Sequence, residues 1–593
     1  MAASTTGYVE AALGRRRLTL LLQKANLVNV FTGETYEASI GIYGDRVVLV
    51  DPSNKPHEAE QVMSAEGLTA VPGLVDTHLH IESSMMTPWR FAEAVLPHGV
   101  TSVFADPHEI ANVLGKAGVK MMIEASTGLP LKIKYFVPTC VPESDAVSAG
   151  ATITAKDVEE MLSWNGVCGL GEVMDYEGVL KGSKRMVEIL DIGRRTDAVV
   201  DGHSPLLSGD RLNAYIAAGA EADHENFDVN TAVEKLRLGM FVKLRGPYLL
   251  DARRFMSRLK KLPSMENLIF CTDDMMPDNL ERLGHLDYIV RSYIEEGMDP
   301  VEAVRSVTLR PALHMRDRNI GAIAPGRYAD IVLLGNLAKF EVRHVVANGR
   351  LVVKEGRLSS RIRPKPFDRR AFRTVLLERL KPSDIKVIAP IKNGTVRVSA
   401  IDFSKYSGRW KDPGEAFLKM ALTELGTANL LVRNSSFVLN DLALVLVFER
   451  HGNGGGRNFG FVRNLIRKGA IASTIAHDAH NLVVVGTNEQ DMMLAANLVI
   501  GSQGGIAAVQ DGATLAHIRL PVAGLMSEQS LPEVAAEMKK LRLAFKSMGV
   551  LDHPYMPLPA LITLSVIPHA RITDKGLFDV DAQKFVPVIL GAK

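Results

Sequence analysis

The chain has 593 residues, of which 47% are hydrophobic and 23% charged, which is the balance of a soluble globular protein rather than a disordered one. This length exceeds a single hydrophobic core, so we expect two to four domains. The formal net charge is only +2, so nothing suggests a polyanion partner such as nucleic acid. No apolar run is long enough for a membrane span or a signal-peptide core, and we expect a cytoplasmic protein.

Three cysteines, Cys140, Cys168 and Cys271, are far apart and form no CxxC pair. This usage fits a reducing compartment and argues against both a disulfide framework and a thiolate zinc site. A metal ion in this chain would therefore be held by imidazole and carboxylate groups.

Short alternating strands with Gly, Asp and Pro turns are predicted over residues 20–70. Beyond them, apolar segments alternate with amphipathic ones such as residues 208–219 and 231–239, which are typical of helices. Eight such units in roughly 250 residues predict a closed (β/α)8 barrel. The predicted barrel strands are residues 70–80, 100–108, 133–141, 167–175, 198–205, 220–226, 240–246 and 268–274. The sixth of these is short and mostly polar.

Polar side chains collect where these apolar segments end. They are His78, His80, Asp106, His108, Glu172, His203, His224, Asp273 and Asp274. In a parallel barrel all strand ends of this kind point to one mouth, where active sites are built. We therefore expect these side chains to converge.

Past the barrel, "GAIAPGRYADIVLLG" and "EVRHVVANGRLVV" return to short strands, which would complete the sandwich begun before the barrel. The basic, Pro-containing stretch "RIRPKPFDRR" is typical of a linker. The predicted fold is α/β: a metal-dependent (β/α)8 barrel with a flanking discontinuous β-sandwich and a C-terminal α+β domain. The expected segments are 1–70 (sandwich), 71–318 (barrel), 319–365 (returning sandwich) and 366–593 (C-terminal domain).

His78 and His80 are two residues apart in a strand, so both imidazoles face the same side and can reach one ion. Taken alone, this pair is more simply two polar residues near a strand end. With His203, His224 and Asp273 at the same mouth, a metal ion removes the cost of burying so many unpaired polar groups. Neutral imidazoles and a carboxylate suit a divalent first-row metal.

Glu172 raises the expected number of ions to two, because a carboxylate can bridge two metals with its two oxygens. Its alternative role is that of a buried ion-pair partner. Oxygen bridging without thiolate favours manganese or iron, with zinc also possible. Two metals would make hydroxide available as the nucleophile near neutral pH, and Asp273 could take the proton released as it attacks.

The stretch "ADPHE" adds Asp106, His108 and Glu109 beside this site. Glu109 is a candidate general acid that would protonate a ring nitrogen or a leaving group. The metalloprotease pattern HExxH is rejected because Asn112 occupies the position of its second histidine.

The arrangement of these residues resembles the amidohydrolase superfamily. Longer motifs narrow the resemblance to its bacterial adenine deaminase family: "PGLVDTHLHIESSMMTP", "ADPHEIANV", "GLGEVMD", "DGHSPLLSGDRLNAYIAAG" and "CTDD". Beyond the barrel, "GAIASTIAHDAHNLVVVGTNEQDM" and "LPVAGLMS" resemble the C-terminal domain of that family. The similarity therefore extends over almost the whole chain from about residue 25.

The resemblance implies that His78, His80 and Asp273 hold one metal, that His203 and His224 hold the second, and that Glu172 bridges them. The implied reaction is hydrolytic removal of the 6-amino group of adenine, which gives hypoxanthine and ammonia. The expected ligands are thus a small purine and two divalent ions, with Mn or Fe favoured. We further expect a homo-oligomer, with a dimer as the working hypothesis.

Two features depart from that pattern or extend it. Where the family usually continues "CTDD" with Arg-His-Pro, this chain has Met275, Met276 and Pro277, and the change could alter the substrate pocket or the rate. The cluster His477-Asp478-Ala479-His480-Asn481 could reach the barrel mouth, bind another metal or hold a domain contact.

Two other functions are compatible with the barrel residues. One is a hydrolase of the same superfamily that acts on a cyclic amide or on another aminated heterocycle. The other is a barrel retained for binding without turnover, which the complete set of metal positions disfavours. A nucleic-acid deaminase would need HxE and PCxxC, and this chain has no CxxC.

Overall fold

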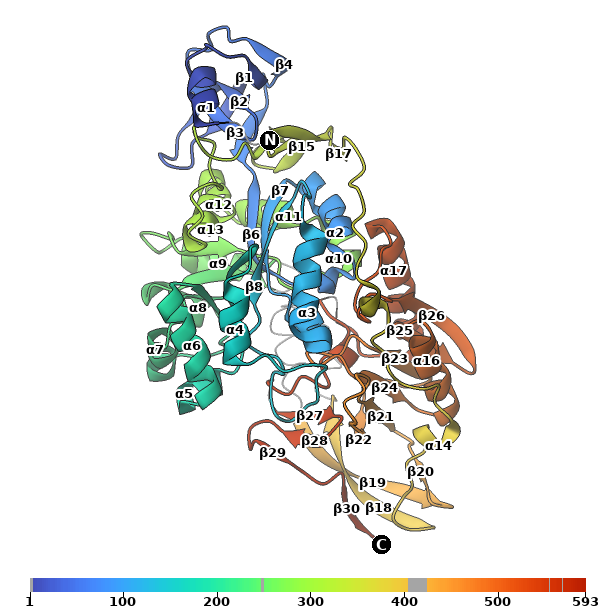
Figure 1. Ribbon diagram of the computed structural model, residues 1–593. Coiled ribbons are helices and arrows are strands. Elements are labelled where there is room, and N and C mark those ends of the chain that lie inside the picture. Colours follow the sequence, from blue (N-terminus) through green and yellow to red (C-terminus); the bar gives the residue numbers. More distant parts are fainter. Residues whose placement is uncertain (1–3, 247–249, 404–423, 554, 568) are drawn as a thin grey trace.

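A computed structural model describes residues 4–246, 250–403, 424–553, 555–567 and 569–593. Figure 1 shows a parallel barrel in the middle of the molecule, coloured blue to green. A sheet made from both flanks of the barrel lies at one end, and the C-terminal third packs along the side and the opposite end.

Each of the eight predicted barrel segments contains a strand, and the strands pair in parallel in chain order. Two backbone hydrogen bonds of 3.0 Å, from Glu221 to Val200 and from Asp273 to His78, join the barrel where its two sheets meet. The strands are β6 (Leu74–Leu79), β7 (Val100–Ala105), β8 (Lys132–Val137), β9 (Val167–Val173), β10 (Val199–Gly202), β11 (Ala222–Asp223), β12 (Phe241–Leu244) and β13 (Leu268–Phe270).

Helices cover the outside of the barrel, which is why every residue of β6 and β7 is buried despite their polar members. The helices predicted over 208–219 and 231–239 are confirmed as α7 and α8, and the Asp228 carboxylate caps α8. The set is α2 (Pro88–Val95), α3 (His108–Ser126), α4 (Ala155–Leu162), α5 (Tyr176–Lys181), α6 (Lys184–Thr196), α7 (Gly209–Ala217), α8 (Val229–Arg237), α9 (Ala252–Leu259), α10 (Pro277–Leu283), α11 (Leu286–Glu295), α12 (Pro300–Ser306) and α13 (Leu309–His314).

The strands before and after the barrel belong to one mixed sheet, because β5 pairs with β14 across more than 250 residues of intervening chain. As predicted, this part of the fold is assembled from the segments on both flanks of the barrel. Its strands are β1 (Leu18–Val28), β2 (Thr35–Tyr43), β3 (Arg46–Asp51), β4 (Ala59–Ser64), β5 (Thr69–Pro72), β14 (Ile331–Asn336), β15 (Glu341–Ala347), β16 (Arg350–Lys354) and β17 (Arg357–Leu358), with α1 (Thr5–Ala12) beside them.

The C-terminal part is α+β, as predicted. A ten-stranded sheet contains β18 (Gly394–Asp402), β19 (Glu424–Arg433), β20 (Ser436–Val438), β21 (Leu442–Phe448), β22 (Arg457–Arg463), β23 (Ala470–Ser473), β24 (Leu482–Gly486), β25 (Gly505–Gln510), β26 (Ala513–Arg519) and β30 (Ile589–Ala592). A small sheet contains β27 (Ala570–Thr573), β28 (Gly576–Asp579) and β29 (Lys584–Phe585), and the helices are α14 (Pro382–Ile385), α16 (Glu489–Gly501) and α17 (Leu531–Met548). Helix α17 packs against α10 of the barrel.

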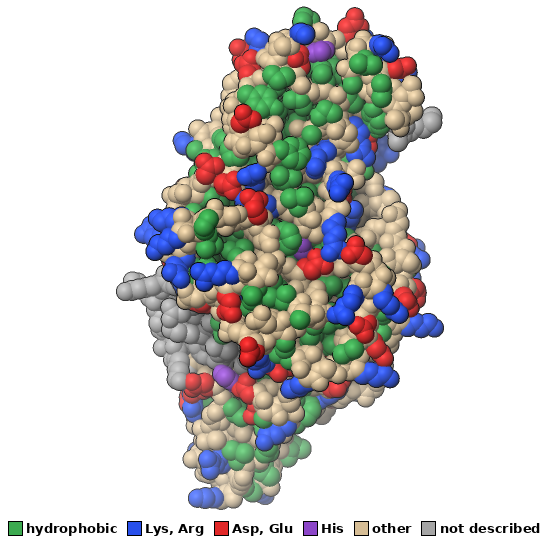
Figure 2. Space-filling view, turned by 90° about the vertical axis from the view of Figure 1, so that its left-hand side faces the viewer, with side chains coloured by type: hydrophobic (Ala, Val, Ile, Leu, Met, Phe, Trp, Pro, Cys, Tyr) green, Lys and Arg blue, Asp and Glu red, His purple; other side chains and the backbone are tan. Residues whose placement is uncertain are grey.

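The surface agrees with the near-neutral composition. On the face shown in Figure 2, basic and acidic side chains are interspersed among apolar ones. Within the part of the chain that the structure describes, every helix is too short or too polar to cross a membrane.

Candidate metal centre

The barrel mouth brings six of the predicted side chains into one largely buried cluster: His78, His80, Glu172, His203, His224 and Asp273. Glu172, at the end of β9, lies at its centre. Its Oε1 atom is 3.4 Å from Nε2 of His78 and 3.0 Å from Nε2 of His80. Its Oε2 atom is 2.9 Å from Nδ1 of His203 and 3.4 Å from Nε2 of His224. Each carboxylate oxygen therefore faces a different pair of imidazoles.

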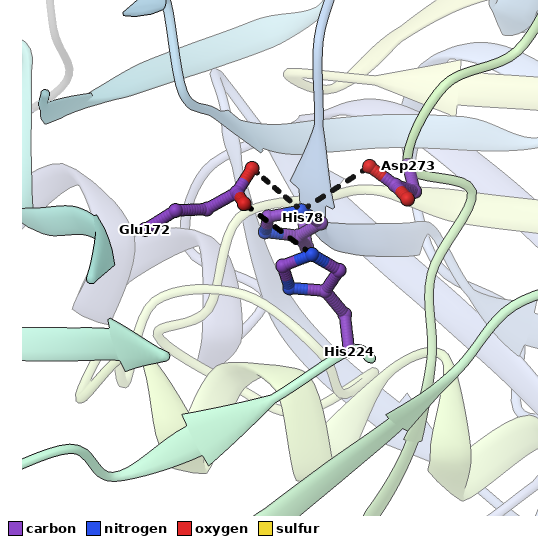
Figure 3. A group of neighbouring side chains, drawn as sticks. All are labelled: His78, Glu172, His224 and Asp273. Atoms are coloured by element: carbon purple, nitrogen blue, oxygen red, sulfur yellow. Dashed lines mark ion pairs between the residues drawn. The ribbon is translucent and has the colours of Figure 1, made fainter. Parts of the chain in front are cut away.

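Asp273 completes one of these two groups of ligand atoms. Its Oδ1 atom is 3.3 Å from Nε2 of His78 and 3.2 Å from Nε2 of His80. Figure 3 shows Glu172 and Asp273 reaching the His78 ring from opposite sides, with the His224 ring stacked close by. Asp273 has a left-handed backbone (φ +58°), a conformation that costs free energy in a non-glycine residue and clusters at functional sites.

The Nδ1 atoms of His78 and His80, on the side of each ring away from Glu172, also have partners. Nδ1 of His78 is 2.8 Å from Oδ2 of Asp201, which also pairs at 2.8 Å with the buried Lys243 ammonium. Nδ1 of His80 lies 3.0 Å from the backbone oxygen of Asp106. Burial lowers the pKa of His78, but the Asp201 charge and the neighbouring carboxylates outweigh it and raise that pKa well above its usual value. Anchors of this kind orient a histidine so that Nε2 faces a metal.

Asp106 supports the cluster from behind. Its Oδ2 atom accepts a 2.8 Å hydrogen bond from the backbone N–H of Glu172. The glycine at 171 permits this contact, because a Cβ atom there would lie 2.2 Å from the same oxygen. His108 lines the cavity at the mouth, with Nδ1 3.9 Å from Oε1 of Glu172.

The spacing of the donor atoms fits a divalent ion. Nε2 of His78 is buried and makes no hydrogen bond within the described residues, although two carboxylate oxygens lie 3.3 and 3.4 Å away. Atoms that share a tetrahedral ion at about 2.1 Å stand roughly 3.4 Å apart. Nε2 of His78 has no hydrogen-bond partner among the described residues and lies at this distance from two carboxylate oxygens. The cluster is therefore suited to hold a metal ion.

A cavity of about 130 Å³ opens above the cluster. This volume is close to the roughly 150 Å³ of an engineered cavity that binds benzene, so the cavity suits a small aromatic ring system. Its walls combine the polar cluster with apolar side chains of the barrel and the C-terminal domain: Met174, Phe227, Met556, Leu561, Leu564, Val566 and Ile567. The C-terminal domain also contributes His477, Asp478 and Tyr555, so it forms part of the site.

Besides Asp201 and Lys243 behind His78, the sequence did not predict Arg245, Glu225 or Tyr555 as site residues. Arg245 lies 2.8 Å from Oε1 of Glu225 and contacts Oδ2 of Asp273. The Tyr555 hydroxyl donates to the same Asp273 oxygen at 3.0 Å. Arg245 is the next-to-last residue of the seventh predicted strand and Glu225 follows His224, so the strand-end rule could have found both. No local signal marks Tyr555.

The residues that depart from the family pattern lie outside the cavity lining. Met275 and Met276 are both buried, and Met276 lines a smaller cavity behind Glu109. Asp274 does line the main cavity, and it accepts hydrogen bonds from Ser83 and from Tyr555. The two methionines therefore alter packing behind the site rather than its wall.

The fold and the buried His/carboxylate cluster together define an amidohydrolase. In agreement, the amidohydrolase family model matches residues 69–352, and the model described as the adenine deaminase C-terminal domain matches residues 420–584.

The chain belongs to the adenine deaminase family. It is 36% identical over 591 residues to the adenine deaminase of Thermosipho melanesiensis, a match covering 98% of this chain and 99% of that protein. It is 37% identical over 607 residues to the adenine deaminase of Moorella thermoacetica, with 100% and 99% covered. Among solved structures, β-aspartyl dipeptidase from Fervidobacterium islandicum AW-1 has 16% identity and a TM-score of 0.44, covering 58% of this chain and 99% of that chain.

Proposed function

We propose that this protein hydrolyses adenine to hypoxanthine and ammonia in a site that holds two divalent metal ions. The observation that carries the proposal is the position of Glu172, whose two oxygens face separate pairs of imidazoles. Membership of the adenine deaminase family supports the substrate.

Two groups of side chains would hold the ions. His78, His80 and Asp273 form the first, His203 and His224 the second, and Glu172 would bridge them. Imidazole and carboxylate ligands without thiolate favour manganese or iron, with zinc possible. When bound, such a pair supplies Lewis-acid activation of a water molecule near neutral pH.

Asp273 would take a proton from the attacking water molecule and pass it to the departing ammonia. One of its oxygens faces His78 and His80, while Arg245 and Tyr555 hold the other. A carboxylate fixed in this way needs little reorganisation as charge develops. The apolar wall would cover the faces of the purine ring and exclude bulk water from the reacting carbon.

The test is purification with manganese supplied, followed by metal analysis and by measurement of ammonia release from adenine. We expect two tightly held ions per chain and rapid release from adenine. A panel of other purines, pyrimidines and cyclic amides tests the rival hydrolase reactions. Absence of ammonia release from adenine by protein carrying two ions would reject adenine as the substrate, and fewer than two ions in active protein would reject the binuclear site.

A further inference from the structure

The carboxylate of Glu109, in the barrel, contacts two imidazoles of the C-terminal domain. Glu109 lies in the first turn of α3, and its Oε1 atom is 3.0 Å from Nδ1 of His477. Its Oε2 atom contacts Nε2 of His480. Both histidines lie between β23 and β24, more than 360 residues further along the chain. Neither domain holds this group of side chains by itself.

The two imidazoles differ in what they face. His477 lines the main cavity together with Glu109, whereas His480 lines only the smaller cavity behind them. The Nδ1 atom of His477 lies at ion-pair distance from two carboxylates, 3.0 Å from Oε1 of Glu109 and 3.3 Å from Oδ1 of Asp478. Its Nε2 atom has no hydrogen-bond partner among the described residues, so that atom is available to a ligand in the cavity.

The charges of this group favour a protonated His477. Burial lowers the pKa of His477, but the negative charge of Glu109 and the Asp478 contact raise it well above its usual value. Burial raises the pKa of Glu109, yet the two imidazoles outweigh it and hold that pKa well below its usual value. The other ionisable groups facing the pair are Asp274, His108 and Glu82. At neutral pH the pair is thus a carboxylate beside an imidazolium, and an ionised Glu109 has no proton of its own to give.

We propose that His477 is the general acid and base of the reaction, that Glu109 orients it through Nδ1, and that His480 is a positioning residue for Glu109. The inference rests on the proposed deamination of adenine. The sequence predicted that Glu109 protonates the ring; the inference assigns this proton transfer to His477 instead. The arrangement follows the general pattern of an imidazole oriented by a carboxylate on its far nitrogen.

His477 and Asp273 would carry the protons that move during the reaction, and both would return to their starting states. As the water oxygen bonds to C6 of adenine, the C6–N1 π-electron pair moves to N1, which takes the proton from Nε2 of His477. The C6–N6 bond then breaks and its electron pair leaves with ammonia, which takes the proton that Asp273 removed from water. The remaining hydroxyl proton returns to Nε2 of His477 as C6=O forms, so hypoxanthine and ammonia leave with His477 again protonated.

The experiment compares the metal-loaded wild-type protein with His477→Asn and Glu109→Gln. For His477→Asn we expect kcat to fall by about 10²- to 10⁴-fold, the range for general acid–base catalysis. KM and the content of two metal ions should stay close to wild type. The fall of kcat at high pH, which reports loss of the His477 proton, should disappear.

Glu109→Gln removes the charge that raises the pKa of His477, so the fall of kcat should move to lower pH with a smaller loss of rate. An exposed histidine of the same domain provides the matched control, because His569 pairs with Asp581 away from the cavity. The His569→Asn variant should leave both kcat and its pH profile unchanged.

Retention of more than a third of kcat with an unchanged pH profile in His477→Asn would overturn the inference. Loss of metal ions or of adenine binding in place of the pH-profile change would also overturn it, since that would show a structural role. If His477→Asn does not fold, the pH shift of Glu109→Gln decides the question. If metal-loaded wild type itself fails to deaminate adenine, the proposed function fails and this inference with it.

Discussion

Replacing Tyr555 by phenylalanine would show whether the C-terminal domain positions Asp273, the proposed proton acceptor. The Tyr555 hydroxyl lies 3.0 Å from Oδ2 of Asp273 and 2.9 Å from Oδ2 of Asp274. Tyr555→Phe removes the hydroxyl and keeps the ring that packs beside Arg245. One hydroxyl proton serves one carboxylate at a time, and the hydroxyl oxygen also accepts a 3.1 Å hydrogen bond from Arg245. Arg245 keeps its contacts with Glu225 and Asp273 in the variant, so the main loss is the hydrogen bond that the hydroxyl donates to a carboxylate, worth about 1.5–3 kcal/mol.

Since about 1.4 kcal/mol corresponds to a factor of ten, kcat/KM should fall by roughly 10- to 150-fold. The assay is steady-state ammonia release from adenine at matched metal content. Tyr293→Phe is the control, because the buried Tyr293 hydroxyl has no hydrogen-bond partner among the described residues and its ring stacks on Phe270. That variant should keep its activity and its melting temperature. A Tyr555→Phe enzyme within twofold of wild type would show that the hydroxyl does not position Asp273.

Two further predictions concern buried carboxyl groups. Glu172→Gln should hold fewer than two metal ions after gel filtration and lose more than about 100-fold in activity, because a neutral amide cannot bridge as a carboxylate does; retention of both ions would contradict the bridging role. Burial, aided by the charge of Asp478, raises the pKa of Glu143 from 4.5 to about 8. The folded state therefore favours the protonated group, and its stabilising contribution is complete below pH 4.5 and lost as pH rises through about 8. Melting temperature should consequently fall less between pH 6 and pH 9 in Glu143→Gln than in wild type, and equal falls in the two proteins would contradict this account.

The sequence determined the barrel and most of the buried His/carboxylate cluster. Apolar segments that end in polar residues predicted eight strands, and even the two-residue β11 forms at the sixth predicted position. Because side chains two residues apart share one face of a strand, the sequence alone assigns His78 and His80 to a common site. The convergence of Glu172 and Asp273 on them followed from barrel geometry, in which all strand ends meet at one mouth.

Only the tertiary structure showed which side chains of the C-terminal domain face the His/carboxylate cluster. The approach of His477 and Tyr555 to the mouth depends on how the C-terminal domain packs against the barrel, and no strand or helix periodicity encodes that packing. The sequence marked the cluster from His477 to Asn481 as one that could reach the barrel mouth, bind another metal or hold a domain contact. It could not name Glu109 as the partner of His480, because the two residues are 371 positions apart. Local periodicity depends on neighbouring residues and predicts which face of a strand or helix a side chain occupies. Contacts between domains depend on how the surfaces of two folded domains fit together, which no local pattern encodes.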